Sequence, residues 1–354
     1  MIITIRSQAT SEERTQLMTQ VCRITGSLHP ITTTVIDGQE LIVLDGTSLA
    51  NETQALLNEQ AAVERITRVK TAYKLVSRAF KAENTRVYVG HGHDCEQVMI
   101  GGKIPTIIAG PCAVENREQL LTTAHAVKHA GAHILRGGAF KPRTSPYQFQ
   151  GLGLEGLHLL AEARKATGLP IITEVMEPEL VETVAQHADI LQIGSRNMQN
   201  YPLLLAVGRH AEKRPVLLKR GLSATIDEWL LAAEYIVAAG NPNVILCERG
   251  IRSYDQQTRN VLDLSCVPLL QELTHLPIVV DPSHATGRRE LVPTMSRASI
   301  AAGANGLIIE VHSDPNNALC DGRQSITPEQ LQKIVREARL LTQIMHEEVM
   351  VQVA

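Results

Sequence analysis

The sequence predicts an α/β protein in which a (β/α)8 TIM barrel follows a small βαββαβ domain of the ferredoxin-like class. From residue 105 onward, short apolar runs alternate with longer amphipathic stretches, a pattern typical of parallel βα units. Eight such units follow one another, which favours a closed barrel over an open sheet. Before residue 70, the predicted order of strands and helices is that of a ferredoxin-like unit.

Length and composition indicate a folded protein with one large and one smaller domain, because the chain has 354 residues, of which 44% are apolar and 20% charged. The net charge is -3 and both signs are interspersed, so we expect neither a nucleic-acid nor a membrane partner. The N-terminal apolar run is too short for a signal peptide, which predicts a cytoplasmic protein. The six scattered cysteines favour reduced thiols.

The N-terminal domain is expected to span residues 1–70. Its predicted elements are a strand at 1–6, a helix at 11–24, strands at 31–36 and 40–44, a helix at 49–59 and a strand at 63–69. Asp37-Gly38, between the two middle strands, is a strong signal for a two-residue hairpin turn. The segment offers no nucleophile, metal cluster or glycine-rich loop, which favours a regulatory or packing role over a catalytic one.

Residues 71–104 are expected to form a linker, with a helix at 71–83 and a short hairpin made by TRVYVG and QVMIGG. The barrel domain then runs from 105 to 354. Its eight strands are predicted at 106–112, 133–137, 170–175, 189–195, 215–220, 243–249, 277–284 and 306–312. A helical pattern follows each strand, and the one at 225–240 ends on Gly240, as suits a helix C-terminus.

Gly151-x-Gly153-x-x-Gly156 has the spacing of a dinucleotide-binding turn, and Glu174 lies where a ribose-binding acid would be expected. In a Rossmann unit, however, the first glycine directly follows a strand. Here a polar stretch of about fifteen residues separates the predicted strand at 133–137 from Gly151. We therefore interpret the three glycines as the approach to the next helix.

Polar side chains gather at the predicted strand ends, where a barrel has its active site. They are Cys112, Arg136, Lys141, Glu174, Arg196, Lys219, Arg220, Glu248, Arg249, Asp281, His284, Glu310 and His312. Five or six cations at one mouth would repel one another unless an anion neutralised them, which predicts a ligand with a phosphate and a carboxylate. The alternative for any one cation is that it pairs with a neighbouring acid at the barrel rim.

Cys112, His284, Glu310 and Asp321 combine sulfur, nitrogen and oxygen donors at the same end of the barrel. Such a set suits one divalent transition-metal ion, namely Mn, Fe, Co or Zn. The alternative is that Cys112 is a buried small apolar residue. The run HGHDC at 91–95 also has metal-binding residues, but it precedes the barrel and is the weaker hypothesis.

The chain resembles the 3-deoxy-D-arabino-heptulosonate 7-phosphate (DAHP) synthases of the type I beta branch. The matching stretches are AGPCAVEN (109–116), LRGGAFKPRTSPYQFQGLG (135–153), ITEV (172–175), IGSRNMQN (193–200), LLKRG (217–221), CERGIR (247–252), VDPSHATGRR (280–289), IIEVH (308–312) and ALCDG (318–322). The predicted N-terminal unit likewise resembles the ferredoxin-like (ACT-like) regulatory domain of that branch.

The resemblance implies a metal-dependent condensation of phosphoenolpyruvate with erythrose 4-phosphate, the first step of aromatic amino acid biosynthesis, in which the metal polarises the aldehyde. Phosphoenolpyruvate would be held by Arg136, Lys141, Arg196, Lys219 and Arg249, and erythrose 4-phosphate by Lys141, Pro142, Arg143, Thr144 and Ser145. Cys112, His284, Glu310 and Asp321 would bind the metal. The residues implied in catalysis are Lys141, Glu174, Cys112 and His284, with Lys141 and Glu174 positioning water and moving protons.

Two alternatives stay open. A 3-deoxy-manno-octulosonate 8-phosphate synthase would carry Asn-Arg after Lys-Ala, whereas this chain has Lys141-Pro142-Arg143-Thr144. A barrel acting only as an aromatic-amino-acid sensor or regulatory subunit is disfavoured because every expected ligand and cation is present.

The resemblance also implies an aromatic amino acid inhibitor at the N-terminal domain, which would dock across the barrel mouth of a neighbouring subunit in a homotetramer or homodimer. A further hypothesis concerns Cys320, which lies beside Asp321. Oxidation that linked Cys320 to Cys112 would remove a metal ligand and inactivate the enzyme.

Overall fold

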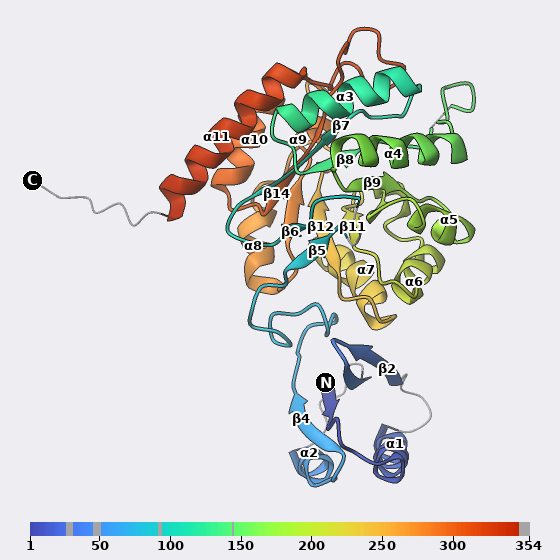
Figure 1. The fold of residues 1–354 in the computed structure, drawn as a ribbon. Helices are drawn as coiled ribbons and strands as arrows, with labels where there is room; N and C mark the ends of the chain where they lie inside the picture. The colour runs from blue at the N-terminus through green and yellow to red at the C-terminus, as the bar shows by residue number, and fades with distance from the viewer. Residues whose placement is uncertain (26–30, 45–50, 91–93, 144, 347–354) are drawn as a thin grey trace, which may run out of the picture.

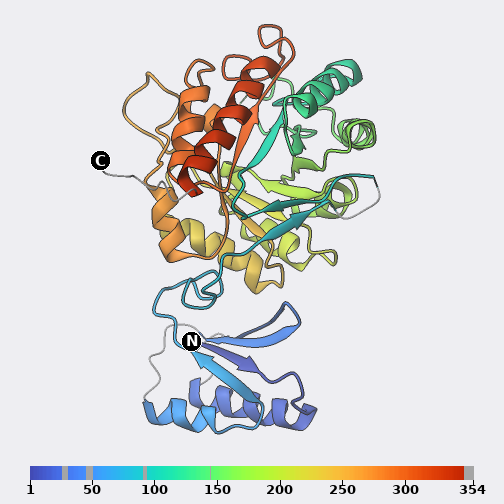
Figure 2. The same ribbon diagram turned by 60° about the vertical axis from the view of Figure 1, so that its left-hand side comes forward.

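The computed structural model describes residues 1–25, 31–44, 51–90, 94–143 and 145–346. Within them lie a four-stranded antiparallel sheet, a two-stranded hairpin and a closed barrel of eight parallel strands. Figures 1 and 2 show the small N-terminal unit on one side of the larger barrel, joined to it by the linker. The predicted fold class is therefore confirmed.

The N-terminal unit has the predicted βαββαβ order. Its elements are β1 (Ile2–Ile5), α1 (Ser11–Thr25), β2 (Ile31–Ile36), β3 (Gln39–Leu44), α2 (Asn51–Asn58) and β4 (Val63–Thr67). The sheet order is β2-β3-β1-β4, and β2 turns into β3 at Asp37 and Gly38, both with positive φ. Because strand side chains alternate, Ile42 packs toward α1 and α2 while Leu41 joins the barrel's outer core.

The linker differs from the prediction, because residues 71–83 form turns and an isolated bridge instead of a helix. The backbone N–H groups of Leu75 and Val76 donate to the two carboxylate oxygens of Glu234, at 2.8 and 3.0 Å. The hydroxyl of Thr274 donates to the carbonyl of Val76 at 2.5 Å. These groups of the barrel satisfy the backbone that a helix would have used. The predicted hairpin is present as β5 (Val87–Val89) and β6 (Val98–Ile100).

All eight predicted barrel strands are present. They are β7 (Thr106–Gly110), β8 (Ile134–Arg136), β9 (Ile171–Glu174), β10 (Ile190–Ile193), β11 (Val216–Lys219), β12 (Val244–Glu248), β13 (Ile278–Val280) and β14 (Gly306–Glu310). The surrounding helices are α3 (Arg117–His129), α4 (Leu154–Thr167), α5 (Val181–Ala185), α6 (Tyr201–Arg209), α7 (Ile226–Ala238), α8 (Cys266–Leu273), α9 (Pro282–Thr286), α10 (Val292–Ala301) and α11 (Pro328–His346). β7 closes the barrel by pairing with both β8 and β14.

The barrel interior has two chemically different layers. The lower layer is apolar and consists of Ile108, Ile134, Ile172, Ile190, Leu217, Ile245, Cys247, Val279 and Ile308. Hairpin residues Val87, Val89 and Ile100 belong to the same buried cluster, so the hairpin seals the N-terminal end of the barrel. Side chains alternate along a strand, so the residue two positions after each of these apolar residues also points into the barrel. It lies nearer the C-terminal end of the barrel. There the upper layer is polar, as described below.

The glycines at 151–156 are explained by close packing instead of nucleotide binding. Gly153 is the N-cap of α4. A Cβ at Gly151 would lie 2.2 Å from the carbonyl oxygen of Ala139, and its φ of 94° also favours glycine. Gly240, with φ of 109°, lies one residue beyond the C-cap of α7, as predicted.

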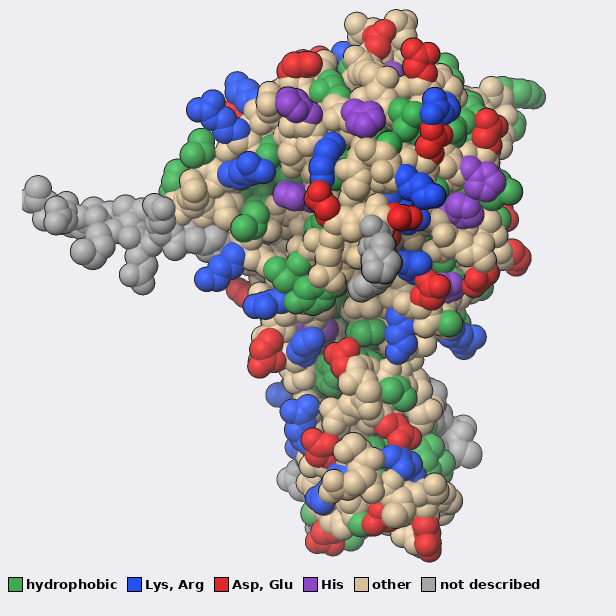
Figure 3. All heavy atoms as spheres, viewed as in Figure 1, with side chains coloured by type: hydrophobic (Ala, Val, Ile, Leu, Met, Phe, Trp, Pro, Cys, Tyr) green, Lys and Arg blue, Asp and Glu red, His purple; other side chains and the backbone are tan. Residues whose placement is uncertain are grey.

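Of the described helices, none has the length and apolar character that would let it cross a membrane. Acidic and basic side chains are interspersed over the face seen in Figure 3. The N-terminal unit lies near the ends of the barrel strands that are remote from the mouth, because Ile36 lines a pocket together with Pro242 and His275, which precede β12 and β13.

Candidate active site

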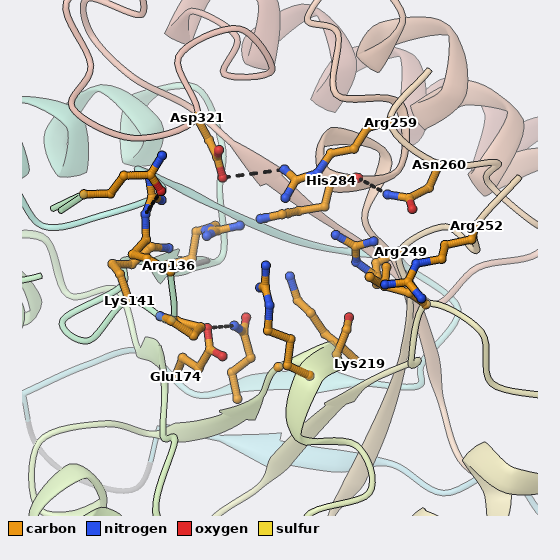
Figure 4. A pocket seen from close by; sticks show the side chains of 18 residues that line it. Arg136, Lys141, Glu174, Lys219, Arg249, Arg252, Arg259, Asn260, His284 and Asp321 are labelled. Atoms are coloured by element: carbon orange, nitrogen blue, oxygen red, sulfur yellow. Dashed lines mark hydrogen bonds and ion pairs between the residues drawn. The ribbon is translucent and has the colours of Figure 1, made fainter. Parts of the chain in front are cut away.

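A polar cavity of about 450 Å³ opens at the C-terminal ends of the barrel strands, where labelled side chains from several strands point into a common space (Figure 4). The predicted residues that line it are Arg136, Lys141, Pro142, Arg143, Glu174, Arg196, Lys219, Arg249, His284 and Asp321. Cys112 and Glu310 are buried beside it. Ser145 is not among the lining residues, and Thr144 lies outside the described residues, as do 91–93 of the HGHDC run.

The upper layer of the barrel interior supplies the deepest part of the site. Arg136, Glu174, Gln192, Lys219, Arg249, Asp281 and Glu310 each follow an apolar interior residue by two positions. The alternation of the strands therefore aims them all into the barrel mouth. This is the physical reason why strand-end residues far apart in sequence form one site.

The cations of the upper layer are buried but incompletely bonded. Arg136, Lys219 and Arg249 expose only 4 to 5% of their surface. Among the described residues, Nε and Nη1 of Arg136 and Nη1 of Arg249 have no hydrogen-bond partner. A buried donor left without an acceptor costs about 1–3 kcal/mol, and more when it is charged. An anionic ligand with several oxygens would satisfy these nitrogens.

Part of the positive charge is already paired within the protein. Lys219 Nζ lies 2.7 Å from Asp281 Oδ2, and Arg136 Nη2 lies 3.1 Å from Glu310 Oε1. The rim-pairing alternative thus holds for these two cations. Burial would raise the pKa of Asp281, but His284 and Lys219 outweigh it, so this pKa lies well below its usual range. The carboxylate is therefore charged and fixes the side chains around it.

His284 is oriented by two acids. Its Nδ1 lies 2.7 Å from Asp281 Oδ2, and its Nε2 lies 3.2 Å from Glu310 Oε1. Because a carboxylate only accepts, Nδ1–H is the donor to Asp281, which leaves the Nε2 lone pair free toward Glu310. Burial lowers the pKa of His284, which favours the neutral imidazole that binds metals. Burial alone would raise the pKa of Glu310, but His284 and Arg136 lower it to about 2.

The predicted metal ligands come together in two overlapping groups. Ligand atoms of Cys112, Cys320 and Asp321 lie within 4.8 Å of one another, and so do those of His284, Glu310 and Asp321. Asp321 belongs to both groups and therefore joins the predicted ligands around one location. Oε1 of Glu310 has no hydrogen-bond partner among the described residues, although it is fully buried. A divalent ion held by sulfur, nitrogen and oxygen would satisfy it, so these residues fit the metal.

The Cys112 thiol lies 3.1 Å from Cys320 Sγ and 3.3 Å from Asp321 Oδ2. Hydrogen bonding to Cys320 and burial raise the pKa of Cys112 well above its usual range. The thiolate form therefore requires a positive charge beside the sulfur, which a metal ion would provide. Cys320 was not among the predicted ligands, yet it lies as close to Cys112 as Asp321 does.

Lys141 and Glu174, the two predicted proton-transfer residues, have different partners. Lys141 Nζ donates to the carbonyl of Cys112 at 2.9 Å. Burial lowers the pKa of Lys141, but Cys112 and Cys320 raise it more strongly, so the net pKa is raised and the side chain is an ammonium ion. Glu174 is buried and accepts from Gln192 Nε2 at 3.4 Å. An ammonium group at this position can donate a proton or act as a fixed positive charge.

The lining residues that were not predicted include these four: Gln192, Arg252, Arg259 and Asn260. Gln192 could have been found from strand periodicity, because it lies two positions after Ile190. The other three come from the long segment between β12 and α8, which has no helical or strand pattern. Arg259 Nη1 donates to Gln324 at 3.0 Å and lies 3.8 Å from Asp321.

The fold and the site together define a class of protein. It is a (β/α)8 barrel enzyme whose mouth suits a phosphorylated, carboxylate-bearing substrate and whose residues can hold a divalent ion. The chain belongs to the DAHP synthetase I family, which its residues 79–347 match.

Curated relatives fall into two groups. The phospho-2-dehydro-3-deoxyheptonate aldolase of Thermotoga maritima is 52% identical over 279 residues, which are 79% of this chain and 80% of the relative. The 2-dehydro-3-deoxyphosphooctonate aldolase of Syntrophotalea carbinolica is 35% identical over 259 residues, 68% of this chain and 92% of the relative.

Two solved structures from one organism are similar to this chain. The crystal structure of the Thermotoga maritima phospho-2-dehydro-3-deoxyheptonate aldolase (DAHP synthase) matches with a TM-score of 0.74 and 43% identity, over 97% of each chain. A truncated form of 3-deoxy-D-arabino-heptulosonate 7-phosphate synthase from the same organism matches 77% of this chain and 97% of its own, with a TM-score of 0.69 and 47% identity. The match to the first of these structures covers 97% of this chain and therefore includes the N-terminal unit.

Proposed function

We propose that this protein is a DAHP synthase, which condenses phosphoenolpyruvate with erythrose 4-phosphate and releases inorganic phosphate. The observation that carries the proposal is the set of buried, unpaired guanidinium nitrogens of Arg136 and Arg249 beside the ligand set around Asp321. Unpaired buried donors favour an anion with many oxygens, as phosphoenolpyruvate has. The neighbouring ligand set supplies a place for an ion that would polarise an aldehyde.

The proposed substrate contacts are those that the resemblance to the family implies, and three of the five cations assigned to phosphoenolpyruvate are buried. The buried Arg136, Lys219 and Arg249, with Lys141 and Arg196, hold the phosphate and carboxylate of phosphoenolpyruvate. The half-buried Pro142 and Arg143, with Thr144 and Ser145 of the same loop, hold erythrose 4-phosphate. The two substrates would then meet with the enol carbon facing the aldehyde.

The protein's groups have complementary proton roles in this reaction. Carbon–carbon bond formation leaves positive charge on C2 of the former enol, which water attacks before phosphate leaves. Glu174 takes a proton from that water, and the Lys141 ammonium donates toward the oxygen that becomes a hydroxyl. Asp281 keeps His284 in the tautomer that presents Nε2 to the ion.

The metal and the second substrate need direct tests. We propose that Cys112, His284, Glu310 and Asp321 hold one Mn, Fe, Co or Zn ion. The experiment is phosphate release from phosphoenolpyruvate with erythrose 4-phosphate or arabinose 5-phosphate, before and after chelation and after each metal is restored. We expect turnover with erythrose 4-phosphate only, its loss on chelation and its return with metal.

Other outcomes of this experiment would select the alternatives. Turnover with arabinose 5-phosphate alone would assign the protein to the activity named for the more distant relatives. Binding of an aromatic amino acid without consumption of phosphoenolpyruvate would indicate a sensor. We also propose that residues 1–70 form a regulatory domain for an aromatic amino acid, acting within a homotetramer or homodimer.

A further inference from the structure

A buried ion pair lies directly behind the proposed phosphoenolpyruvate site. Arg220 follows Lys219 at the end of β11, and Glu248 precedes Arg249 at the end of β12. Lys219 and Arg249 line the cavity, so the alternation of the strands turns Arg220 and Glu248 outward, into the layer between the barrel and its helices. Neither lines the cavity.

The pair is almost completely removed from water and has few unused hydrogen-bonding groups. Arg220 Nη1 donates to Glu248 Oε2 at 3.0 Å and to Asp263 Oδ2 at 2.9 Å. The side chain of Glu248 has 0% exposure and that of Arg220 has 6%. Arg220 also lies 5.9 Å from the ring centre of Trp229 on α7.

Such a pair requires an explanation other than stability. The remaining neighbours in this layer are mainly apolar, and two charges buried there lose their hydration. An apolar pair of similar volume is often as stable as a buried ion pair or more so. We therefore look for the role of the pair in the backbone groups to which its two side chains are hydrogen-bonded.

The pair fixes the two loops that follow the strand ends bearing Lys219 and Arg249. Arg220 Nε donates to the carbonyl of Ala224, at the end of the loop after β11. Glu248 Oε1 accepts from the N–H of Gly250 at 2.6 Å, in the loop after β12. The two loops are also joined directly, because Arg252 N donates to the carbonyl of Leu222 at 2.8 Å.

We propose that Arg220 and Glu248 are positioning residues that set the separation and direction of Lys219 and Arg249, and thereby the affinity of the site for phosphoenolpyruvate. The inference rests on the proposed function, which assigns these two cations to that substrate. Neither Arg220 nor Glu248 touches the substrate. Their effect passes through the backbone of the two strand ends, where Lys219 is paired in register with Cys247.

The main test replaces the pair with apolar residues of similar length, Arg220→Met with Glu248→Leu, so that neither fully buried charge is left without the other. Asp263, whose side chain is 21% exposed, loses Arg220 but keeps the hydroxyl of Ser265 and access to water. We expect KM for phosphoenolpyruvate to rise at least tenfold. We expect KM for erythrose 4-phosphate to stay within twofold of the parent value, because Pro142 and Arg143 lie on the loop after β8. Calorimetric titration with phosphoenolpyruvate should show the same weakening without turnover.

Arg220→Lys is the conservative variant and covers the case in which the double variant does not fold. Lysine keeps the charge beside Glu248 but has no planar fork to reach Asp263 and the Ala224 carbonyl together. We expect an affinity for phosphoenolpyruvate between those of the parent and the double variant.

Arg164→Met is the matched control, since Arg164 pairs with Asp189 at 3.3 Å, just before β10 and away from the mouth. It should leave both KM values unchanged. The inference would be overturned if the folded double variant bound phosphoenolpyruvate as tightly as the parent. If the double variant does not fold, the same result with Arg220→Lys would overturn it. A parent protein without turnover would instead contradict the proposed function.

Discussion

At the scale of single residues, Gly194 shows how a missing side chain shapes the site. Its φ of -69° is open to any residue, so backbone strain does not require glycine there. A Cβ at this position, however, would lie 2.1 Å from Glu174 Oε1. Glycine at 194 therefore leaves the room that the carboxylate of Glu174 occupies beside the cavity.

Gly194→Ala is expected to displace Glu174 and to lower kcat by roughly a hundredfold if that carboxylate moves protons. Steady-state kinetics of Gly194→Ala, Glu174→Gln and the double variant would check this. The double variant should be no slower than Glu174→Gln alone, because both changes remove the same function. If the reductions in kcat of the two single variants multiplied in the double variant, Gly194 would act through something other than Glu174.

Cys112 and Cys320 form a second residue-scale feature with a testable consequence. All six cysteines are free, and the two sulfurs lie 3.1 Å apart in the buried site. We expect peroxide to inactivate the enzyme by converting the two thiols to a disulfide, with peroxide reduced to water, and dithiothreitol to restore activity. Cys320→Ala should resist this inactivation. Equal sensitivity of the variant and the parent would exclude the route.

At the scale of elements, the linker is held to the barrel by buried polar groups. His275 Nε2 donates to the carbonyl of Leu75 at 2.8 Å, and Nδ1 accepts from the hydroxyl of Thr85 at 2.7 Å. Both bonds use the neutral ring, since a carbonyl only accepts. Burial lowers the pKa of His275 to about 4, from an ordinary value of 6.5. Folding therefore disfavours protonation of this ring.

This predicts a pH dependence of stability. Between pH 6.5 and 4 the unfolded chain binds a proton at His275 that the folded protein does not, so stability falls as the pH falls through this window. The difference amounts to about 3 kcal/mol at most. Chemical unfolding of the parent at pH 7 and pH 4.5 should show a larger loss than that of His275→Gln. Equal losses would show that other groups dominate this range.

Correctly and wrongly predicted elements differ in the position of the groups that stabilise them. The strands follow apolar periodicity, which depends on the chain's own alternation, and all eight barrel strands were predicted. The predicted helix at 71–83 was wrong because its backbone is bonded to Glu234, 159 residues after Leu75. No local pattern records such a distant partner.

The same distinction applies to the site. Strand-end residues such as Arg136 and Lys219 were predicted, since strand order alone places them at the mouth. Arg252 and Arg259 were missed because their loop lacks the periodic apolar pattern of a helix or strand. The pairing of Lys219 with Asp281 depends on the register between strands that are not neighbours, and sequence does not contain it.

At the scale of the whole molecule, the N-terminal unit is remote from the mouth of its own barrel. Regulation by this unit would therefore act either through the linker or on another subunit. The truncated Thermotoga maritima relative matches only 77% of this chain. Its solved structure shows that a shortened protein of this family can fold. A matching truncation of this protein is thus a practical experiment.

We expect deletion of residues 1–70 to leave DAHP formation within a few-fold of the parent and to abolish inhibition by phenylalanine, tyrosine or tryptophan. Inhibition curves for each amino acid with the parent and the truncated protein would check this. Inhibition that persisted after the deletion would place the amino acid site on the barrel.

The hairpin of β5 and β6 fills one end of the barrel with Val87, Val89 and Ile100, so among the described residues the cavity at the other end is the opening through which small molecules exchange with solvent. Under the proposed assignment, the deep cations bind one substrate and the outer loop binds the other along that single route. Inorganic phosphate formed at Arg136 and Lys219 then lies behind the newly formed sugar acid and has to wait until it has left. The order of product departure would therefore follow from the plugged floor of the barrel, with phosphate leaving last.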